Sequence, residues 1–541
     1  MTPPVFPHEI QQRIARVRDY HRASGLTDSP RAKRAQFTQN FVSDLFPDAS
    51  TIALPKSLLD APVSVLAALQ EGVDAAPDSI RRPPHDLHTL ATWLYFGGGT
   101  TEIKDDLGHA LRTCPGEDAT DPCELYVAAF RVKDLAPGLY HFSSSDFSLR
   151  RLRDGASTLR QLQRGRPDLR LLSDLPAALI VSSICCRSSG RFGLRGYRAG
   201  VFGVGRIVQN FVTAGHGLGM QTMPRLRLVD ATARELIGLA PRCPYHELEH
   251  VHGLILWADH AGPDAPALVT APAGDAPVGM PAIARNAPPG EVVSFGSIQT
   301  VHEDCVAPGV ATRDIREPHT ELSPVVASAK MQQFDAPTDW PESRDVRHVL
   351  LAPRPPAPVP RTAISRDVLT AVSRVTFRGG SVFPIFPSGP HLGLVRPFWV
   401  IHDVTGMEPG IWYHNPINNG WCLMIGGEHR IESKYLTLDR EAFGNAAAVC
   451  WMVLNLSKLM TCAGPDLYRL AHLEAGLATR RIELAAEALG AQAHFTSEFF
   501  DEEARRFLGL EKTNWEVIAA VAVGSVDRST QADRTEGLIS M

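Results

Sequence analysis

Residues 191–219, RFGLRGYRAGVFGVGRIVQNFVTAGHGLG, decide the fold because they allow two different structures. Gly203 and Gly205 could form the tight turn of a dinucleotide-binding loop, which requires a preceding strand and an acidic residue about 20 positions further on. Val201, Val204 and Val208 instead recur at three- and four-residue spacing, which is the period of one helix face. This spacing predicts a long buried helix.

A second copy of the stretch supports the helix. A shift of 271 residues places residues 196–222 on residues 467–493, LYRLAHLEAGLATRRIELAAEALGAQA, so that Tyr197 falls on Tyr468 without a gap. Glu474 then stands where the first copy has Gly203. A carboxylate at that position is incompatible with close contact to a pyrophosphate, because like charges repel. The dinucleotide loop is therefore disfavoured.

The repeat extends well beyond this helix. The same shift aligns VDATARELIGL (residues 229–239) with FDEEARRFLGL (residues 500–510), and a shift of 272 aligns Pro137-Gly138 with Pro409-Gly410. We infer two divergent copies of one α+β domain. We expect the same order of elements in each copy, with the first copy's residues given before the second's. A helix (87–96; 364–372) and a strand (124–132; 396–404) come first, followed by a Pro-Gly turn with a short strand. Another strand (177–185; 446–454), the long helix, a shorter helix and a last strand (253–258; 517–524) complete the copy.

These copies predict five segments. They are an N-terminal arm (1–75), a first domain (76–260), a linker and arm rich in Pro, Ala and Gly (261–345), a second domain (346–528) and a C-terminal tail (529–541). A chain of 541 residues is also too long for one ordinary core, which agrees with two domains.

The composition excludes several classes of protein. The net charge of −5 gives no electrostatic footprint for nucleic acid or an anionic membrane. Residues 1–25 lack the pattern of a signal peptide, and no uninterrupted apolar run reaches about 18 residues. We expect a soluble, cytosolic protein. Its nine cysteines include no C-x-x-C pair, so we expect reduced, mostly buried thiols rather than disulfides.

Several motifs together resemble one family. RFGLRGYRAG and VGRIVQNFVTAGHGLG are similar to KYGxRxYR and AGHxxQNLxLxAxxLGLG of the SagB-type azoline dehydrogenases, a branch of the nitroreductase superfamily. RTCPGEDATDPCELYV and LAPGLYHF are similar to that branch's RxxPSGGAxHPxELYV and LxPGLYHY, and the second copy adds FPSGPHLG and YRLAHLEAG. The resemblance covers roughly residues 80–260 and 346–528.

The resemblance implies a fold, a cofactor and a reaction. Members of the branch are homodimers that bind FMN at the subunit interface, so a tandem fusion resembles that dimer within one chain, an intrachain pseudo-dimer of FMN-binding domains. It implies an FMN-dependent oxidoreductase that oxidises thiazoline or oxazoline rings of a ribosomally made peptide to thiazoles or oxazoles. Expected partners are the precursor peptide and a cyclodehydratase complex, with the protein itself a monomeric pseudo-dimer or a higher homo-oligomer.

Two alternatives remain open. One is a nitroreductase-like enzyme acting on another small molecule. The other is a flavin-free pseudoenzyme that binds a peptide or scaffolds a peptide-modifying complex.

The cofactor candidates divide unevenly between the copies. Guanidinium groups suit the FMN phosphate, and the resemblance points to arginines near the start of each domain and of each long helix: Arg81, Arg82, Arg195, Arg198, Arg354 and Arg469. Its PSGG-like loop is kept in the second copy as Pro387-Ser388-Gly389, whereas the first copy has the acidic 115–118, PGED. If these loops pack in trans, Arg81 and Arg82 with residues 387–389 form the better site. Arg354, with Arg528 or Arg534, and the acidic loop form the other. We expect one working flavin site per chain.

The candidate catalytic residues depart from the pattern of the family. The branch carries an adjacent Lys-Tyr pair where this chain has Arg191-Phe192 and Cys462-Ala463. Arginine does not deprotonate near neutral pH, and phenylalanine has no proton to exchange. Substitutes are Tyr197, Tyr468 and Lys458. Structural roles for the tyrosines, at helix starts or bonded to backbone, are equally compatible with the sequence.

One competing motif is HELEH at residues 246–250, which matches the zinc-peptidase pattern HExxH. Pro244 precedes it and an apolar strand follows, so a helix that would align His246 with His250 is not expected. We predict an exposed polar loop and no metal.

Overall fold

The computed structural model describes residues 6–27, 45–70, 82–103, 110–117, 121–165, 172, 174–226, 230–239, 243, 245, 247–258, 283–286, 296–306, 331–334, 344–352, 359–377, 393–416 and 418–526. The chain forms two compact units. The first unit contains residues 34–63 and 73–309, and the second contains residues 1–33, 64–72 and 310–541. Residues 1–75, the predicted arm, therefore contribute to both units.

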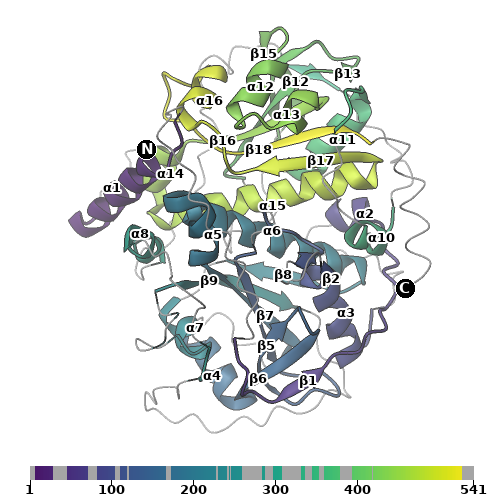
Figure 1. Cartoon of the computed structure of the whole chain (residues 1–541), viewed down its shortest axis with the longest axis vertical. Coiled ribbons are helices and arrows are strands. Elements are labelled where there is room, and N and C mark those ends of the chain that lie inside the picture. Colours follow the sequence, from purple (N-terminus) through teal and green to yellow (C-terminus); the bar gives the residue numbers. More distant parts are fainter. Residues whose placement is uncertain are drawn as a thin grey trace. The chain divides into compact units, whose positions relative to one another are not determined.

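The first unit is built on an antiparallel seven-stranded sheet (Figure 1). Its order is β1 (Thr51–Ala53), β6 (Ser148–Asp154), β5 (Gly138–Ser143), β4 (Cys123–Ala129), β7 (Ala177–Ile184), β9 (Glu249–Trp257) and β8 (Thr222–Arg225). The central strands β4, β7 and β9 are buried along their whole length. Most of their residues are apolar because helices cover both faces of the sheet, although each strand also buries polar side chains.

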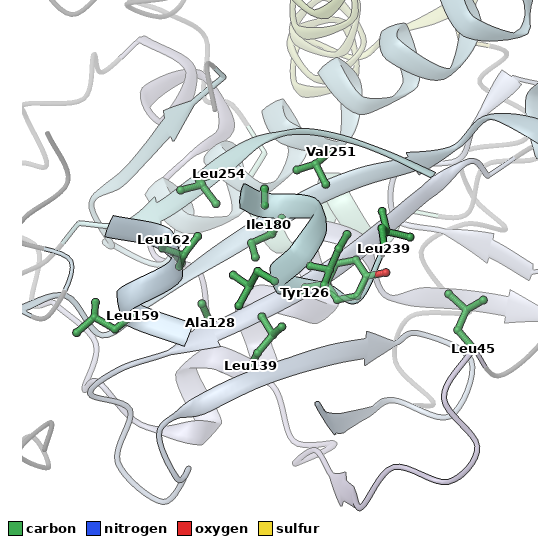
Figure 2. Packing of buried hydrophobic residues seen from close by; sticks show 14 of the residues in the cluster. Leu45, Tyr126, Ala128, Leu139, Leu159, Leu162, Ile180, Leu239, Val251 and Leu254 are labelled. Atoms are coloured by element: carbon green, nitrogen blue, oxygen red, sulfur yellow. The ribbon is translucent and has the colours of Figure 1, made fainter. Parts of the chain in front are cut away.

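Two layers of helices enclose this sheet. α3 (Leu87–Gly98), α5 (Cys185–Phe192) and the long α6 (Gly196–Gly217) pack together, and α6 contacts β4, β7 and β9. On the other face, α4 (Gly155–Gly165) and α7 (Asp230–Leu236) enclose the core of Figure 2, in which Leu159 and Leu162 face Tyr126, Ala128 and Ile180. The hairpin β2 (Thr100–Ile103) and β3 (Ala110–Arg112) and the helix α8 (Gly296–Val306) complete the unit.

The second unit repeats this sheet with the same strand order. The order is β10 (Gln332–Gln333), β15 (Gly420–Gly426), β14 (Gly410–Asn415), β12 (Arg396–Ile401), β16 (Ala448–Leu454), β18 (Glu516–Ser525) and β17 (Ala491–Thr496). Each strand thus has a counterpart in the first sheet. This agreement confirms the predicted α+β architecture with two similar domains.

The helices of the second unit also divide between two faces. α11 (Arg366–Phe377) packs on the long α15 (Asp466–Ala488), which also contacts α2 (Val65–Gln70), α10 (Val346–Leu351) and α14 (Leu456–Ala463). The apolar core of the other face includes residues of α12 (Arg430–Leu436), α13 (Glu441–Asn445) and α16 (Asp501–Phe507). α1 (His8–Ala23) and the short parallel pair β11 (Ile364–Ser365) and β13 (Val404–Thr405) belong to the same unit.

The opening stretch forms the predicted helix. Gly203 and Gly205 lie inside α6, so they form no dinucleotide turn. One pair of glycines shared by both copies instead follows the helix ends: Gly219 and Gly490 have φ of 78° and 74° after α6 and α15. This left-handed conformation closes a helix C-terminus and is strained for any residue with a Cβ.

Some expected details are corrected. The helix expected at 364–372 begins at Arg366, because Ile364 and Ser365 pair with β13. The sequence patterns gave no sign of the outer strands β6, β8, β15 and β17, whose burial is mixed. No helix among the described residues is long and apolar enough to cross a membrane. All nine cysteines are free, and seven of them are buried, as expected.

Candidate functional site

The two long helices begin with the candidate residues. In the first unit α5 ends at Gly193, with φ of 58°, and a short 3-10 turn (193–195) leads into α6. Arg195, Tyr197 and Arg198 are all about 2% exposed. No side chain caps the start of α6. The first turn of α6 therefore depends on tertiary contacts for its position.

A histidine cluster meets Tyr197. The Tyr197 hydroxyl lies 3.2 Å from Nδ1 of His302, a residue of α8. The His302 ring stacks on His250 of β9 with centroids 4.0 Å apart, and His250 Nε2 lies 3.0 Å from Oε1 of Gln299. His252 Nε2 bonds to the Ser183 hydroxyl at 2.8 Å. These side chains place α8, from the segment predicted as linker and arm, against the start of α6.

The second unit places Tyr468 in the same way. Its hydroxyl lies 3.3 Å from Nδ1 of His21, a residue of α1. Nε2 of His21 lies 3.8 Å from a carboxylate oxygen of Glu516. This carboxylate favours the proton on Nε2, which leaves Nδ1 to accept from the Tyr468 hydroxyl. The ring of His472 lies beside Tyr468, with centroids 4.5 Å apart.

The other candidates of the second unit lie on the helix before. Lys458 and Cys462 are half-buried on α14, and Asn455 caps that helix by accepting from the Lys458 N–H at 3.0 Å. Gly464, with φ of 103°, separates α14 from α15. On α15, Arg469 follows Tyr468 in the sequence, and both side chains are buried. Lys458, Tyr468 and Arg469 therefore sit on two helices joined at one glycine.

Glu474 has a structural role that explains why it replaces Gly203. Its Oε1 accepts from the backbone N–H groups of Leu394 and Val395 at 2.6 and 3.0 Å, just before β12. Burial raises the pKa of this carboxyl to about 7, although the two N–H groups and Arg396 favour the ionised form. In the first unit Gly203 faces Pro122, which has no N–H to satisfy.

A second position that differs between the two copies, Asn210 in the first and Arg481 in the second, joins the long helix to the first helix of its domain. Asn210 donates from Nδ2 to the carbonyls of Phe96 and Gly97, at 3.0 and 2.9 Å, at the end of α3. In the second unit Arg481 stands at the position of Asn210 and donates to the carbonyl of Val375, near the end of α11, at 2.6 Å. Burial lowers the pKa of Arg481 to about 9. Both residues satisfy helix carbonyls that have no partner within their own helix.

The last two residues of the HELEH motif belong to a buried strand, not to the predicted exposed loop. Glu249 and His250 are fully buried and begin strand β9, so the prediction of a surface loop is wrong, while Glu247 is exposed and His246 lies outside the described residues. No group of three or more metal-ligating side chains among the described residues could hold a metal ion.

Glu249 is buried because an arginine neutralises it. Arg285 Nη1 lies 2.5 Å from its carboxylate, and the hydroxyls of Tyr126 and Ser182 donate to it at 2.7 and 2.5 Å. Arg285 also donates to the Tyr126 oxygen and the Ile237 carbonyl, both at 2.8 Å. Segment 283–286, within the predicted linker, is thus anchored in the first unit.

A second buried carboxylate lies on β4 of the same sheet. Glu124 is paired with Arg187 at 2.6 Å and with Nε2 of His141 at 2.8 Å. Burial opposes its ionisation, but Arg187 and His141 outweigh burial and hold the pKa of Glu124 well below its usual value. The second unit has Arg396 at the position of Glu124, so this ion pair is specific to the first unit.

The remaining cofactor and catalytic candidates lie at exposed or half-buried positions or outside the described residues. Arg82 is exposed and Arg191 is half-buried, with its guanidinium 5.6 Å from the ring centre of Phe192. Arg81, Arg354, Arg528, Arg534 and residues 387–389 lie outside the described residues. In the acidic loop, Glu117 is buried and the Pro115 carbonyl accepts from Arg206 at 2.5 Å.

The sequence interpretation missed the histidines that meet the tyrosines. His21 and His302 lie in arms outside the aligned domains, so the domain repeat did not include them. At a shift of 281 residues His21 falls on His302, but Tyr20 falls on Val301, so the sequence gave too little identity to reveal the pair. Glu516 and Arg285 carried no local signal, because their roles depend on partners brought together by the fold.

The comparisons with known proteins point to one fold. The nitroreductase family profile matches residues 419–525. A Methanocaldococcus jannaschii protein described as a nitroreductase is 27% identical over 154 residues, which is 28% of this chain and 75% of that protein. A crystal structure described as a nitroreductase, from Anabaena variabilis, covers 95% of this chain and 99% of its own at 19% identity, with a TM-score of 0.69.

An E. coli microcin synthetase complex with a truncated precursor bound also matches, covering 48% of this chain and 99% of its own at 16% identity. Its TM-score of 0.29 is too low to support a structural argument. The chain thus contains a nitroreductase family domain and has the nitroreductase fold in two similar units.

Proposed function

We propose that this protein is an FMN-dependent oxidoreductase of the azoline dehydrogenase type, acting on heterocyclised residues of a ribosomally made peptide. The observation that carries the proposal is the family match over residues 419–525, which contains the long helix α15 and its YRLAHLEAG motif. The motif set of the first copy adds the link to the azoline branch. The precursor peptide and a cyclodehydratase complex would be the partners.

The donor chemistry at the two helix starts fits a flavin phosphate. Arg195, Arg198 and Arg469 are at most 3% exposed, and a buried guanidinium is a strong, directional partner for a phosphate dianion. We assign these three arginines as candidate FMN ligands, with Arg81, Arg82 and the 387–389 loop in the working site and Arg354 in the site that contains the acidic loop. We expect one functional flavin per chain, because the acidic 115–118 loop would repel the phosphate.

Azoline oxidation removes one hydride equivalent and one proton from the ring. FMN, when bound, supplies the two-electron acceptor, so the chain itself must orient the ring and accept the proton. Tyr468 is the stronger candidate of the two tyrosines, because His21 Nδ1 faces its hydroxyl and Glu516 faces the opposite ring nitrogen. Lys458 is the second candidate. Arg191 can hold charge at the position of the missing lysine but cannot take up a proton.

The cofactor is tested by the visible spectrum of the purified chain. We expect absorbance near 450 nm, the usual flavin band, with about one FMN per chain after reconstitution. Arg469→Ala should lower the FMN content, whereas the exposed Arg22→Ala, on α1, should not. A chain that shows no flavin absorbance, even after FMN is added, would sink the proposal and favour the flavin-free scaffold.

The reaction is tested by mass spectrometry of an azoline-containing peptide. We expect a loss of about 2 Da per ring, and Tyr468→Phe should slow it more than Tyr197→Phe. The missing Lys-Tyr pair favours one other function, a nitroreductase-like enzyme for a different small molecule. A flavin-loaded protein that leaves azoline peptides unchanged but reduces a nitroaromatic compound would establish that alternative instead.

A further inference from the structure

Helices α14 and α15 of the second unit meet at a junction with few constraints of its own. Gly464 has φ of 103°, and no side chain caps the start of α15. Glycine readily adopts many backbone conformations, so the angle between the helices is not fixed by the junction itself. The relative position of Lys458, on α14, and of Tyr468 and Arg469, on α15, therefore depends on the packing of α14 against α15 and on any further element that spans the junction.

Helix α1 spans it, and in Figure 1 it lies beside α14. Arg18 Nη2 donates to the hydroxyls of Ser457 and Thr461, both on α14, at 2.8 and 3.0 Å. One turn further along α1, His21 meets the Tyr468 hydroxyl on α15. Arg18 and His21 are three residues apart and so lie on the same face of the helix.

The contacts around His21 make this attachment specific. The edge of the Tyr20 ring meets Tyr468 with centroids 6.4 Å apart, and His21 is only 7% exposed. Beyond the helix, the Leu26 N–H donates to the carboxylate of Asp501, at the start of α16, at 2.9 Å, and the Leu26 carbonyl accepts from the Asp501 N–H at 3.2 Å. The arm is therefore held on both sides of His21.

The first unit shows a different attachment. His302 of α8 meets Tyr197 as His21 meets Tyr468, but Gln299, at the position of Arg18, contacts His250 on strand β9 instead of the preceding helix α5. Among the described contacts, then, the link from an arm helix to both helices of the junction occurs in the second unit.

We propose that Arg18 and His21 are positioning residues: α1 clamps α14 to α15 across Gly464 and so sets where the Tyr468 hydroxyl and Arg469 stand in the flavin site. The role in catalysis rests on the proposed function, whereas the clamp itself does not. The tyrosine that this clamp positions is Tyr468 of the second unit.

Hydrogen exchange followed by mass spectrometry tests the clamp in the full-length chain. His21→Ala and Arg18→Ala should each speed exchange of the amides in residues 464–470 by roughly tenfold or more, because a buried hydrogen bond is lost. His21→Asn, which keeps an acceptor near the position of Nδ1, should restore most of the protection. Arg22→Ala is the matched control, because that side chain on the same helix is 79% exposed.

Unchanged exchange at 464–470 in both alanine variants would overturn the clamp. So would an equal rise throughout β12 and β16, which would show general destabilisation. If His21→Ala does not fold, Tyr468→Phe removes the same hydrogen bond while keeping the ring, and it should give the same local rise.

Flavin binding separates the two proposals. If FMN binds, His21→Ala should lower FMN content or shift its absorbance maximum, and His21→Asn should reverse the change. A rise in exchange with an unaltered flavin would overturn the positioning role. A wild-type chain that never binds FMN would defeat the proposed function, while the exchange result would still decide the clamp.

Discussion

Removing Arg285 should destabilise the first unit by about 3–5 kcal/mol. Arg285 and Glu249 are 1% and 0% exposed, so the truncation to methionine leaves a carboxylate buried without its counter-charge. The hydroxyls of Tyr126 and Ser182 continue to donate to Glu249 but cannot neutralise it. The guanidinium also lies 4.8 Å from the centre of the Phe46 ring, and loss of this contact costs up to about 2 kcal/mol. The losses of the ion pair and of the contact with Phe46 are not additive, so we keep the estimate of about 3–5 kcal/mol for the broken ion pair alone.

The two units allow an internal control. We would measure amide exchange in β4, β7 and β9, where we expect opening to increase by roughly 10² to 4 × 10³-fold, at about 1.4 kcal/mol for each factor of ten. Strands β12, β16 and β18 form the equivalent sheet of the second unit and should not change. Global unfolding curves serve less well here, because two compact units need not unfold in one step.

A double variant tests whether the loss is electrostatic. Arg285→Met with Glu249→Gln removes both charges, and replacing a buried pair with neutral groups is often close to neutral in stability. We therefore expect the double variant to regain at least half of the stability that Arg285→Met loses. The reasoning is refuted if Arg285→Met costs less than about 1 kcal/mol, or if the double variant loses the sum of the two single losses.

Two other substitutions have expected outcomes. Burial raises the pKa of Glu474 from 4.5 to about 7, so between these pH values the folded state holds a proton that the unfolded state releases. The stability of the second unit should therefore fall by about 3 kcal/mol as the pH rises from 4.5 to 7. Glu474→Gln should abolish this fall, which denaturation of the second unit at several pH values would measure. Burial lowers the pKa of His402 and His414 to about 4, so the second unit should lose stability as the pH falls from 6.5 to 4. Protonation of Glu474 opposes this loss in the wild-type chain, so the loss should become steeper in Glu474→Gln. A shallower loss in the variant would contradict both assignments. Gly196→Ala should cost about 1–3 kcal/mol in a thermal melt, because its Cβ would lie 2.6 Å from the Ser189 Cα; an unchanged melting temperature would show that α5 and α6 can separate.

The sequence predicted the parts of the fold that carry a local, periodic signal. The buried strands β4, β7, β16 and β18 each contain an apolar run of at least five residues. Helices α6 and α15 show apolar residues at helical spacing over more than five turns. The repeat then strengthened each assignment, since a pattern seen twice in one register is unlike chance. The outer strands were missed because a sheet edge needs no continuous apolar run.

The site could be predicted only where the family motifs reach. Tyr197 and Tyr468 follow from the aligned copies, but their histidine partners are 105 and 447 residues distant in sequence, and nothing local reveals such a pair. Glu249 shows the same limit in the opposite direction. The polar residues next to Glu249 indicated an exposed loop, whereas the ion pair with Arg285, 36 residues further on, offsets the cost of burying its carboxylate.

The exchange of Gly203 for Glu474 shows how two copies of one domain can diverge without losing the fold. Pro122 has no N–H, so the first unit needs no acceptor facing the start of β4, and glycine is tolerated there. Leu394 and Val395 offer two N–H groups at the corresponding place, and these would be buried without a partner if Glu474 were absent. Each residue is therefore compatible only with the loop end of its own unit. The same substitution that excludes a pyrophosphate site is thus half of a compensated pair, and it gives the second unit a titratable carboxyl at the two residues that precede β12.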